Sequence, residues 1–397
     1  MFEPSDVAYL SSEAGSTGLA RASAYTFSAG TLVADTAALR TEFGDRAAVL
    51  AQTVQLRRKA AAKLGDVQDW LFTDDALQQA TPAAVARHRA ERLADRVVHD
   101  VTCSVGAELA ALDGVAATVI GSDIDPVRTA MARHNIGRRV LICQADALAP
   151  SSRADVVIAD PGRRSGGRRR FDPSAYSPPL DLVLRTYADR DLVVKCAPGL
   201  DFTDLREQTG FGGEIEVVSL DGGVREACLW SAGLARARRR ATVLSTAGDG
   251  FQLTDADPDD CALAEAGEWI IDPDGAVVRA GLVRQYAARH GLWQLDPRIA
   301  YLSGDSVPAG VQGYRVLDAL AYSEKRLRQA LAARDCGSVE ITVRGVDVDP
   351  AVLRTRMKLR GGVALSVVIT RIGSDARAFV CAARSPGGTR TPGPRSA

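Results

Sequence analysis

The sequence predicts an α/β protein whose central domain contains a doubly wound, mostly parallel sheet. A helical N-terminal region precedes this domain, and a smaller α+β region follows it. Three observations predict this arrangement: helix-forming residues dominate at first, short apolar runs then alternate with helical stretches, and strand and helix patterns mix after residue 240. With 397 residues, the chain has room for two or three domains with substantial cores.

Residues 1–95 are expected to be helical, because Ala, Leu, Arg and Gln are frequent there and clusters of β-branched residues are few. The stretch "TPAAVARHRAERLADR" has a typical helix start, with Thr81 as the expected N-cap and Pro82 at the first helical position. We interpret this region as a helical cap on the domain that follows.

Residues 96–235 are expected to form the α/β domain. Its apolar runs are "VVHDV", "ATVIGSDID", "VLICQAD", "DVVIAD", "DLVVKC", "EIEVVSL" and "EACLWSAG". These runs are continuous rather than alternating, as in strands that are buried on both faces of a parallel sheet. A helical pattern in "PVRTAMARHNIG" separates the second run from the third, whereas "DGGVRE" predicts a hairpin between the last two.

Residues 240–384 are expected to form an α+β region. The segments "GEWII", "SVEITVRG", "VALSVVITRI" and "ARAFVCAA" have strand patterns, and "YSEKRLRQALAAR" and "AVLRTRMKL" have helical patterns. The tail, residues 385–397, is rich in Pro, Gly and Ser and is expected to be disordered.

Composition sets limits on the function. Lys+Arg and Asp+Glu both number 49, so a basic surface for nucleic acid can only be local. The seven cysteines are scattered singly, which favours neither a disulfide framework nor a metal site. The start "MFEPSDVAYLSS" does not resemble a signal peptide, and no apolar run approaches the roughly 20 residues that span a bilayer. We therefore expect a cytoplasmic protein without a metal or membrane contact.

Acidic residues stand at the ends of four successive predicted strands: Asp100, Asp123, Asp146 and Asp160. Ligands of open α/β sheets bind outside the carboxyl ends of the strands. Four carboxylates around one crevice would repel phosphate. They suit a ligand that carries positive charge, hydroxyl groups and an exocyclic amine.

The turn after the first strand separates two candidate ligands. A dinucleotide needs a GxGxxG loop to bind its pyrophosphate, but this turn has Thr102, Ser104 and a single glycine, Gly106. S-adenosylmethionine has no pyrophosphate; it has a ribose, an adenine, an α-amino group and a sulfonium. The strand-end acids fit those groups.

Residues 97–232 resemble a class I S-adenosylmethionine-dependent methyltransferase domain, which has a Rossmann-like fold, in "DVTCSVGAE", "GSDID", "QADAL" and "DPGRR". The whole chain resembles bacterial methyltransferases with a C-terminal THUMP-like domain, here at about 313–384. The segments that carry this wider resemblance are "LRRKAAAKL", "ALQQATPAAVARHRAERL", "DPGRRSGGRRRFDPSAYSPPL", "KCAPGLD", "REACLW" and "VEITVRGVDVDPAVLRTRMKLRG".

The resemblance implies roles for individual residues. Asp100 and Gly106 would contact the methionine end of the cofactor, Asp123 the ribose hydroxyls and Asp146 the adenine amine. The same resemblance adds Cys103, Ile124 and Ala147 to the expected cofactor-binding residues. Asp160 and Pro161 would face the transferred methyl group as the catalytic residues. Taken singly, each Asp could equally be a helix cap or a turn residue.

The turn at Asp160 indicates the kind of atom that is methylated. Amine-methylating relatives have D/N-P-P-aromatic at this position, whereas Gly162 and Arg163 follow Asp160 and Pro161 here. An arginine can stack on a base in place of an aromatic ring, and Tyr176 is a second candidate platform. An exocyclic amine or ring nitrogen of a base is therefore the expected target. Lys195 is expected to contact a phosphate or orient the loop, or else to be a plain surface lysine.

Five arginines follow the turn within eight residues: Arg163, Arg164, Arg168, Arg169 and Arg170. Such a local cluster can neutralise a phosphate backbone, although it could also be a solvated loop or pair with acids elsewhere. More basic residues lie near the C-terminus: Arg344, Arg354, Arg356, Lys358 and Arg360. THUMP-type modules bind RNA, so the resemblance implies RNA as the partner.

The leading hypothesis is a methyltransferase that modifies a base in RNA, either tRNA or rRNA. The first alternative is a methyltransferase acting on a protein or a small acidic substrate. The second is a catalytically inactive RNA-binding protein, because the cofactor loop lacks its usual glycines. The sequence leaves open the target nucleotide and atom, the oligomeric state and the need for a partner protein.

Overall fold

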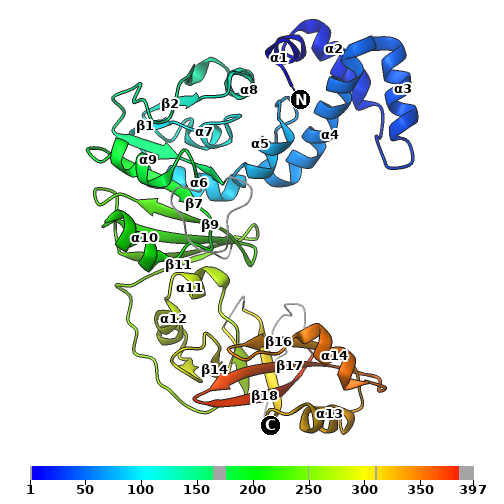
Figure 1. The fold of residues 1–397 in the computed structure, drawn as a ribbon, viewed down its shortest axis with the longest axis vertical. Helices are drawn as coiled ribbons and strands as arrows, with labels where there is room; N and C mark the ends of the chain where they lie inside the picture. Colours follow the sequence, from blue (N-terminus) through cyan, green and yellow to red (C-terminus); the bar gives the residue numbers. More distant parts are fainter. Residues whose placement is uncertain (1, 164–175, 249, 309–310, 384–397) are drawn as a thin grey trace, which may run out of the picture. The chain divides into compact units, whose positions relative to one another are not determined.

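The computed structural model describes residues 2–163, 176–248, 250–308 and 311–383 (Figure 1). Its contacts divide the chain into two units, Met1–Leu220 with Arg225–Arg236, and Asp221–Val224 with Ala237–Ala397. The residues expected as a helical region and those expected as an α/β domain thus belong to one unit. The domain boundaries from the sequence remain predictions.

The first unit begins with six α-helices: α1 (Pro4–Leu10), α2 (Glu13–Ser23), α3 (Leu32–Phe43), α4 (Ala47–Leu64), α5 (Asp74–Gln79) and α6 (Ala83–Arg92). Local caps define two of their starts. The Ser12 side chain accepts a hydrogen bond from the Gly15 amide before α2, and the Thr73 side chain accepts one from the Ala76 amide before α5.

The core of these helices continues into the α/β part. Leu10, Leu50 and Val54 share one hydrophobic cluster with Val105 and Met131, which follow in the sheet region. The helical region is therefore packed as part of the first unit.

The sheet of the first unit has the strand order β8-β9-β7-β4-β1-β2-β3. Its strands are β1 (Val97–Asp100), β2 (Thr118–Asp123), β3 (Leu141–Gln144), β4 (Val156–Ala159), β7 (Asp191–Cys196), β8 (Glu214–Leu220) and β9 (Gly223–Trp230). The pairs from β7 through β3 are parallel, whereas β9 is antiparallel to β7. The hairpin expected before β9 turns at Asp221 and Gly222, which both have positive φ.

Helices cover both faces of this sheet. They are α7 (Ala107–Leu112), α8 (Pro126–Ile136), α9 (Leu180–Thr186) and α10 (Phe202–Thr209). Alternate residues of β4 belong to different clusters, since Val157 packs with α9 and α10 and Ile158 packs with α7 and α8. A short antiparallel pair, β5 (Gly162–Arg163) and β6 (Tyr176–Ser177), follows β4. The predicted doubly wound fold is confirmed.

The second unit is an α+β structure. An antiparallel pair, β10 (Arg239–Leu244) and β11 (Phe251–Thr254), comes first. A sheet of order β13-β14-β12-β15-β18-β17-β16 follows. Its elements are β12 (Trp269–Ile271), α11 (Gly275–Arg279), α12 (Val283–His290), β13 (Trp293–Gln294), β14 (Leu302–Gly304), β15 (Gly313–Ala321), α13 (Glu324–Ala332), β16 (Cys336–Arg344), α14 (Pro350–Met357), β17 (Val363–Ile372) and β18 (Asp375–Ala382).

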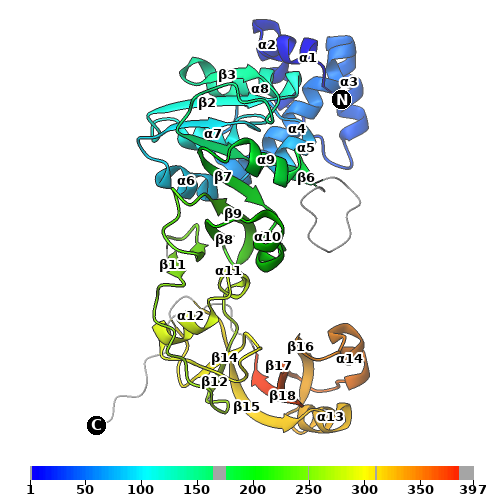
Figure 2. The ribbon, with the colours of Figure 1, turned by 60° about the vertical axis from the view of Figure 1, so that its left-hand side comes forward.

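Helices α13 and α14 cover one face of this sheet, as Figure 2 shows. Leu327 and Leu331 of α13 and Leu353 and Met357 of α14 pack in one cluster with residues of β16 and β17.

Two features of the fold bear on the expected partners. In the part of the chain that the structure describes, every helix is too short or too polar to traverse a bilayer. Over the same residues, His, Cys, Asp and Glu side chains do not gather in a group of three that could hold a metal ion.

Candidate functional site

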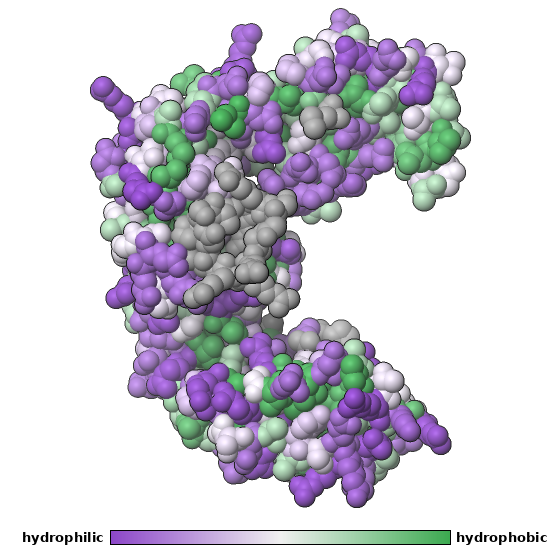
Figure 3. Space-filling model, in the orientation of Figure 1, coloured by the Kyte–Doolittle hydropathy of each residue, from purple (hydrophilic) through white to green (hydrophobic). Residues whose placement is uncertain are grey.

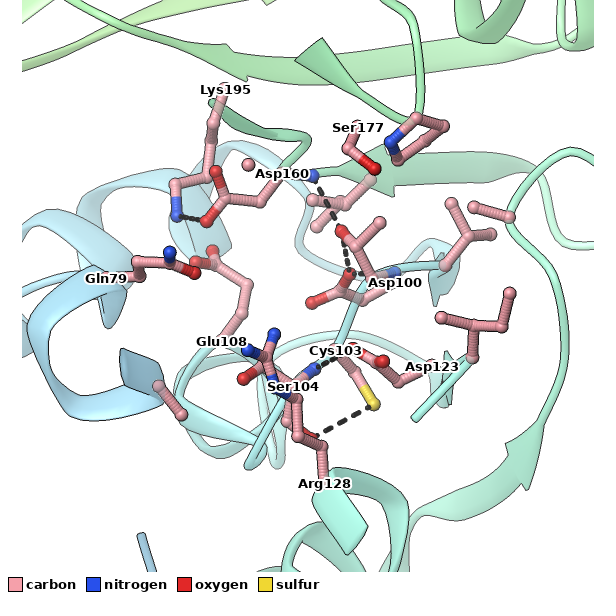
Figure 4. A pocket seen from close by; sticks show the side chains of 18 of the residues that line it. Gln79, Asp100, Cys103, Ser104, Glu108, Asp123, Arg128, Asp160, Ser177 and Lys195 are labelled. Carbon is pink, nitrogen blue, oxygen red and sulfur yellow. Dashed lines mark hydrogen bonds and ion pairs between the residues drawn. The ribbon is translucent and has the colours of Figure 1, made fainter. Parts of the chain in front are cut away.

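A cavity of about 420 Å³ opens at the carboxyl ends of β1, β2, β4 and β7 in the first unit (Figure 4). This size falls within the range of about 300–1,000 Å³ that is usual for small-ligand sites. Eight of the residues predicted from the sequence line it: Asp100, Cys103, Asp123, Ile124, Asp146, Ala147, Asp160 and Lys195. The four strand-end acids thus face one hollow.

Asp100 is buried at the end of β1. Its Oδ1 accepts hydrogen bonds from the amide of Thr102, at 3.0 Å, and from the Thr102 hydroxyl, at 3.3 Å. Burial raises the pKa of Asp100 to about 7, and the negative charge of nearby Glu108 adds to this rise. The Thr102 hydroxyl also accepts a hydrogen bond from the Asp160 amide at 2.6 Å, which ties the end of β1 to the end of β4.

The loop after β1 closes with a serine at a position of positive φ. Ser104 has φ of 49°, and its amide donates to Asp123 Oδ2 at 2.9 Å. The other oxygen, Asp123 Oδ1, accepts from the Asp125 amide at 3.0 Å. Burial raises the pKa of Asp123. The loop therefore holds its shape without the usual glycines, and the second strand-end acid is fixed in place.

Gly106 does not line the cavity, and its backbone conformation and packing explain why a glycine stands there. It has φ of 92° directly before α7, and an added Cβ would lie 2.9 Å from Ile136 Cγ1. Both the left-handed backbone and this close approach favour glycine.

Asp160 and Lys195 form an ion pair across the ends of β4 and β7. Lys195 is only 8% exposed, so it is not a surface lysine. Burial is the largest single influence and would lower its pKa, but the negative charges of Asp160, Glu226 and Glu108 together outweigh it and the pKa is raised. The pair uses Asp160 Oδ2, and Oδ1 has no hydrogen-bond partner among the described residues. The Asp160 side chain is 38% exposed, so its free oxygen can serve a ligand.

Other predicted site residues lie elsewhere. Pro161 is buried next to Asp160 but is not part of the cavity wall. Tyr176 is 2% exposed and packs in a core cluster with Leu180, while its neighbours Ser177 and Pro178 line the cavity in its place. The structure thus buries the residue predicted as a stacking platform.

The arginine cluster is described only at its start. Arg163 lies in β5. Arg164, Arg168, Arg169 and Arg170 lie outside the described residues.

Part of the cavity wall could not be recognised in the sequence. Gln79 at the end of α5, and Ala80 and Thr81 between α5 and α6, come from the N-terminal region, which was interpreted only as a cap. Helix α6 begins at Ala83, with Pro82 rather than Thr81 at the cap position, and Thr81 faces the cavity instead. Two charged residues were also missed, Glu108 of α7 and Arg128 of α8. Glu108 stands in the quoted segment "DVTCSVGAE", yet nothing in its spacing assigned it a function.

The lining fits a positively charged nucleoside better than a phosphate. Five carboxylates line the cavity, those of Asp100, Glu108, Asp123, Asp146 and Asp160, against the two basic side chains of Arg128 and Lys195. Carboxylates accept hydrogen bonds from hydroxyl, amine and ammonium groups. S-adenosylmethionine carries all three and a sulfonium, so the residues present fit this cofactor.

Comparisons with known proteins give the same assignment. The family described as THUMP domain-like matches residues 311–383. The chain is 60% identical over 358 residues to an uncharacterized S-adenosylmethionine-dependent methyltransferase of Mycobacterium tuberculosis, found in strains CDC 1551 / Oshkosh and ATCC 25618 / H37Rv. This match covers 86% of this chain and 99% of the relative.

The fold is also shared with a solved structure. A crystal structure from Porphyromonas gingivalis W83, assigned as a methyltransferase, superposes with a TM-score of 0.69 at 18% identity, over 85% of this chain and 90% of that one. The predicted enzyme class and cofactor are confirmed by the close relatives. The chain therefore belongs to the S-adenosylmethionine-dependent methyltransferases, and it carries a THUMP-like domain at its C-terminal end.

Proposed function

We propose that this methyltransferase modifies a nitrogen atom of a base in RNA, in tRNA or rRNA. The observation that carries this proposal is the THUMP-like segment, residues 311–383, in the same chain as the cofactor cavity. THUMP-type modules bind RNA, and this resemblance supports RNA over a protein or a small acidic substrate.

Local charge supports the proposal. The arginine cluster from Arg163 to Arg170 follows directly after Asp160 in the sequence. In the THUMP-like domain, Lys358 and Arg360 are exposed, and Figure 3 shows a largely hydrophilic surface over α13 and α14. Other basic residues there already have partners within the protein. Arg344 pairs with Asp272, Arg354 donates to the Val339 carbonyl, and Arg356 pairs with Glu324.

The cavity also favours nitrogen as the target atom. A carbon target in a pyrimidine requires a reactive thiolate, and Cys103 is the one thiol among the described lining residues. Cys103 is buried, and burial raises its pKa well above the ordinary value. A protonated, enclosed thiol is a poor nucleophile. The free Oδ1 of Asp160, by contrast, can accept a hydrogen bond from an amine.

The chain's own residues would mainly bind and align the reactants. S-adenosylmethionine, when bound, supplies an activated methyl group and its own leaving group. Asp123 and Asp146 would hold the adenosine end, and Asp160 would orient the amine that accepts the methyl group. Lys195 keeps the Asp160 carboxylate in one position, and the bond from the Asp160 amide to Thr102 fixes its backbone.

Label transfer tests this proposal. The full-length protein is incubated with radiolabelled S-adenosylmethionine and with total RNA, DNA or protein fractions. We expect label in the RNA fraction, and nuclease digestion should recover it on a base. Label in the protein fraction alone would overturn the proposal and support the alternative substrate class.

RNA affinity should depend steeply on salt, and the arginine cluster should carry part of that dependence. We expect that replacing Arg163, Arg164, Arg168, Arg169 and Arg170 by Ala lowers the slope of log affinity against log salt. The decrease should be about 0.7–0.9 for each phosphate that the variant no longer neutralises. Exposed Arg87 and Arg153 serve as control substitutions. An unchanged slope in the cluster variant would remove these arginines from the RNA interface.

Cofactor affinity should rise with pH through neutrality. The pKa of Asp100 is about 7, so near pH 6 this group is mostly protonated, and binding a cation must first remove that proton. A cation stabilises the ionised form, so affinity should increase about fivefold from pH 6 to pH 7, measured by calorimetry. Asp100→Asn should flatten this dependence. If the cofactor affinity of the wild-type protein did not change between pH 6 and pH 7, the assignment of Asp100 as a group that titrates near neutrality would be contradicted.

A further inference from the structure

Glu108 is a buried carboxylate of the cavity that the steps above do not use. It lies in the first turn of α7, its side chain is 7% exposed, and it lines the cavity. Its Oε2 accepts a hydrogen bond from Arg89 of α6. Its Oε1 is buried and has no hydrogen-bond partner among the residues that the structure describes. Figure 4 shows the carboxylate on the side of the cavity that holds Gln79 and Lys195.

The buried ion-pair cluster that contains Glu108 has an excess of negative charge. Arg89 is fully buried and bonds to both Glu108 and Glu226, so one positive charge serves two carboxylates. Two further basic side chains, Lys195 and Arg128, line the cavity. Lys195 is paired with Asp160, and Arg128 Nε lies 3.6 Å from Asp125 Oδ2. A buried anionic oxygen without a donor is costly, and a ligand cation in the cavity removes that cost.

The proposed cofactor placement puts a cation at this point. Asp123 and Asp146 would take the adenosine at the ends of β2 and β3, which leaves the part of the cavity near β1 and α7 for the amino acid end. We propose that Glu108 binds the α-ammonium group of S-adenosylmethionine through Oε1, and that this contact selects ligands with an intact amino acid portion. The inference rests on this cofactor placement and is independent of the RNA substrate.

The test uses two ligands that differ at the amino acid end. S-adenosylhomocysteine keeps the α-ammonium group, and 5′-methylthioadenosine lacks the amino acid portion. Calorimetry on the full-length protein gives the ratio of their affinities. Glu108→Gln should lower the affinity for S-adenosylhomocysteine by about ten- to a hundredfold, the usual range for removal of a charge-assisted hydrogen bond. The affinity for 5′-methylthioadenosine should change less than about twofold.

Glu226→Gln is the matched control. Glu226 bonds to the same arginine and is similarly buried, but it does not line the cavity. Its variant should keep the wild-type ratio of affinities. Glu108→Asp retains the charge on a shorter side chain and should fall between wild type and Glu108→Gln.

Two results would overturn the proposal. One is a Glu108→Gln variant that keeps the wild-type ratio of the affinities for S-adenosylhomocysteine and 5′-methylthioadenosine. The other is a decrease of this ratio that is equally large in Glu108→Gln and Glu226→Gln. Because no RNA is present in these titrations, the outcome is separate from that of the label-transfer experiment.

Discussion

Replacing Asp160 by Ala should lower the rate of methyl transfer at least a hundredfold and leave cofactor affinity nearly unchanged. Lys195 holds one oxygen of the side chain, and the other has no partner among the residues that the structure describes, which leaves it for the target amine. Without it, the amine loses its acceptor and its alignment, and the loss of one positioned hydrogen-bonding group of this kind costs about 10²–10³-fold in rate. Single-turnover rates on the labelled RNA fraction measure the effect, and calorimetry measures cofactor binding.

A second variant separates the loss of the hydrogen-bond acceptor from the effect of leaving Lys195 unpaired. Asp160→Ala leaves Lys195 buried without its ion pair, so the double variant Asp160→Ala with Lys195→Met restores a balanced charge. We expect the double variant to regain stability but not turnover. Asp189→Ala, on an exposed loop away from the cavity, is the control for general effects. Wild-type turnover in Asp160→Ala would refute the assigned role.

Replacing Arg89 by Met should produce the largest loss of stability. Arg89 is 1% exposed and pairs with Glu108 and Glu226, which are also buried. Its removal leaves two carboxylates without a counter-charge, and breaking a buried pair in this way costs about 3–5 kcal/mol. For a unit of this size, the midpoint of thermal unfolding should fall by roughly 6–20 °C. Denaturant unfolding of the full-length protein measures the change in free energy.

Removing the two negative charges as well identifies the cause. Replacing Glu108 and Glu226 by Gln in the Arg89→Met background removes the uncompensated charges, so this triple variant should regain part of the lost stability. Arg87→Met, on the exposed face of the same helix, should change the free energy of unfolding by less than about 0.5 kcal/mol. If Arg89→Met lowered the free energy of unfolding as little as Arg87→Met does, Glu108 and Glu226 would have found other partners.

Much of this site could be predicted because strand ends are marked in the sequence. Asp100, Asp123, Asp146 and Asp160 each follow an apolar run, and a parallel sheet brings such positions together. The enzyme class and cofactor follow from that arrangement together with the family resemblance. For this prediction, the exact boundaries of the strands mattered less than their order along the chain.

The remaining residues could not be predicted because their positions depend on tertiary packing. Gln79 and Thr81 reach the cavity only because the N-terminal helices pack against the α/β part, where α6 contacts α7 and α1 contacts α8. No local pattern encodes those contacts. Glu108 is held by an ion pair with Arg89, which lies on a separate helix. Tyr176 carries a polar hydroxyl that suits a surface position, yet its side chain is 2% exposed and packs in a core cluster. Gly106 matched a cofactor motif, but its conformation and its contact with Ile136 explain it without a ligand.

The shared core of the first unit has a consequence for synthesis on the ribosome. Leu50 and Val54 of α4 pack in the same cluster as Val105 and Met131. Most of this cluster comes from residues 2–77, so the helices that are translated first can pack against one another, but they complete their core only when the chain up to Met131 has left the exit tunnel. Until then, the part of their apolar surface that Val105 and Met131 cover stays exposed on the nascent chain.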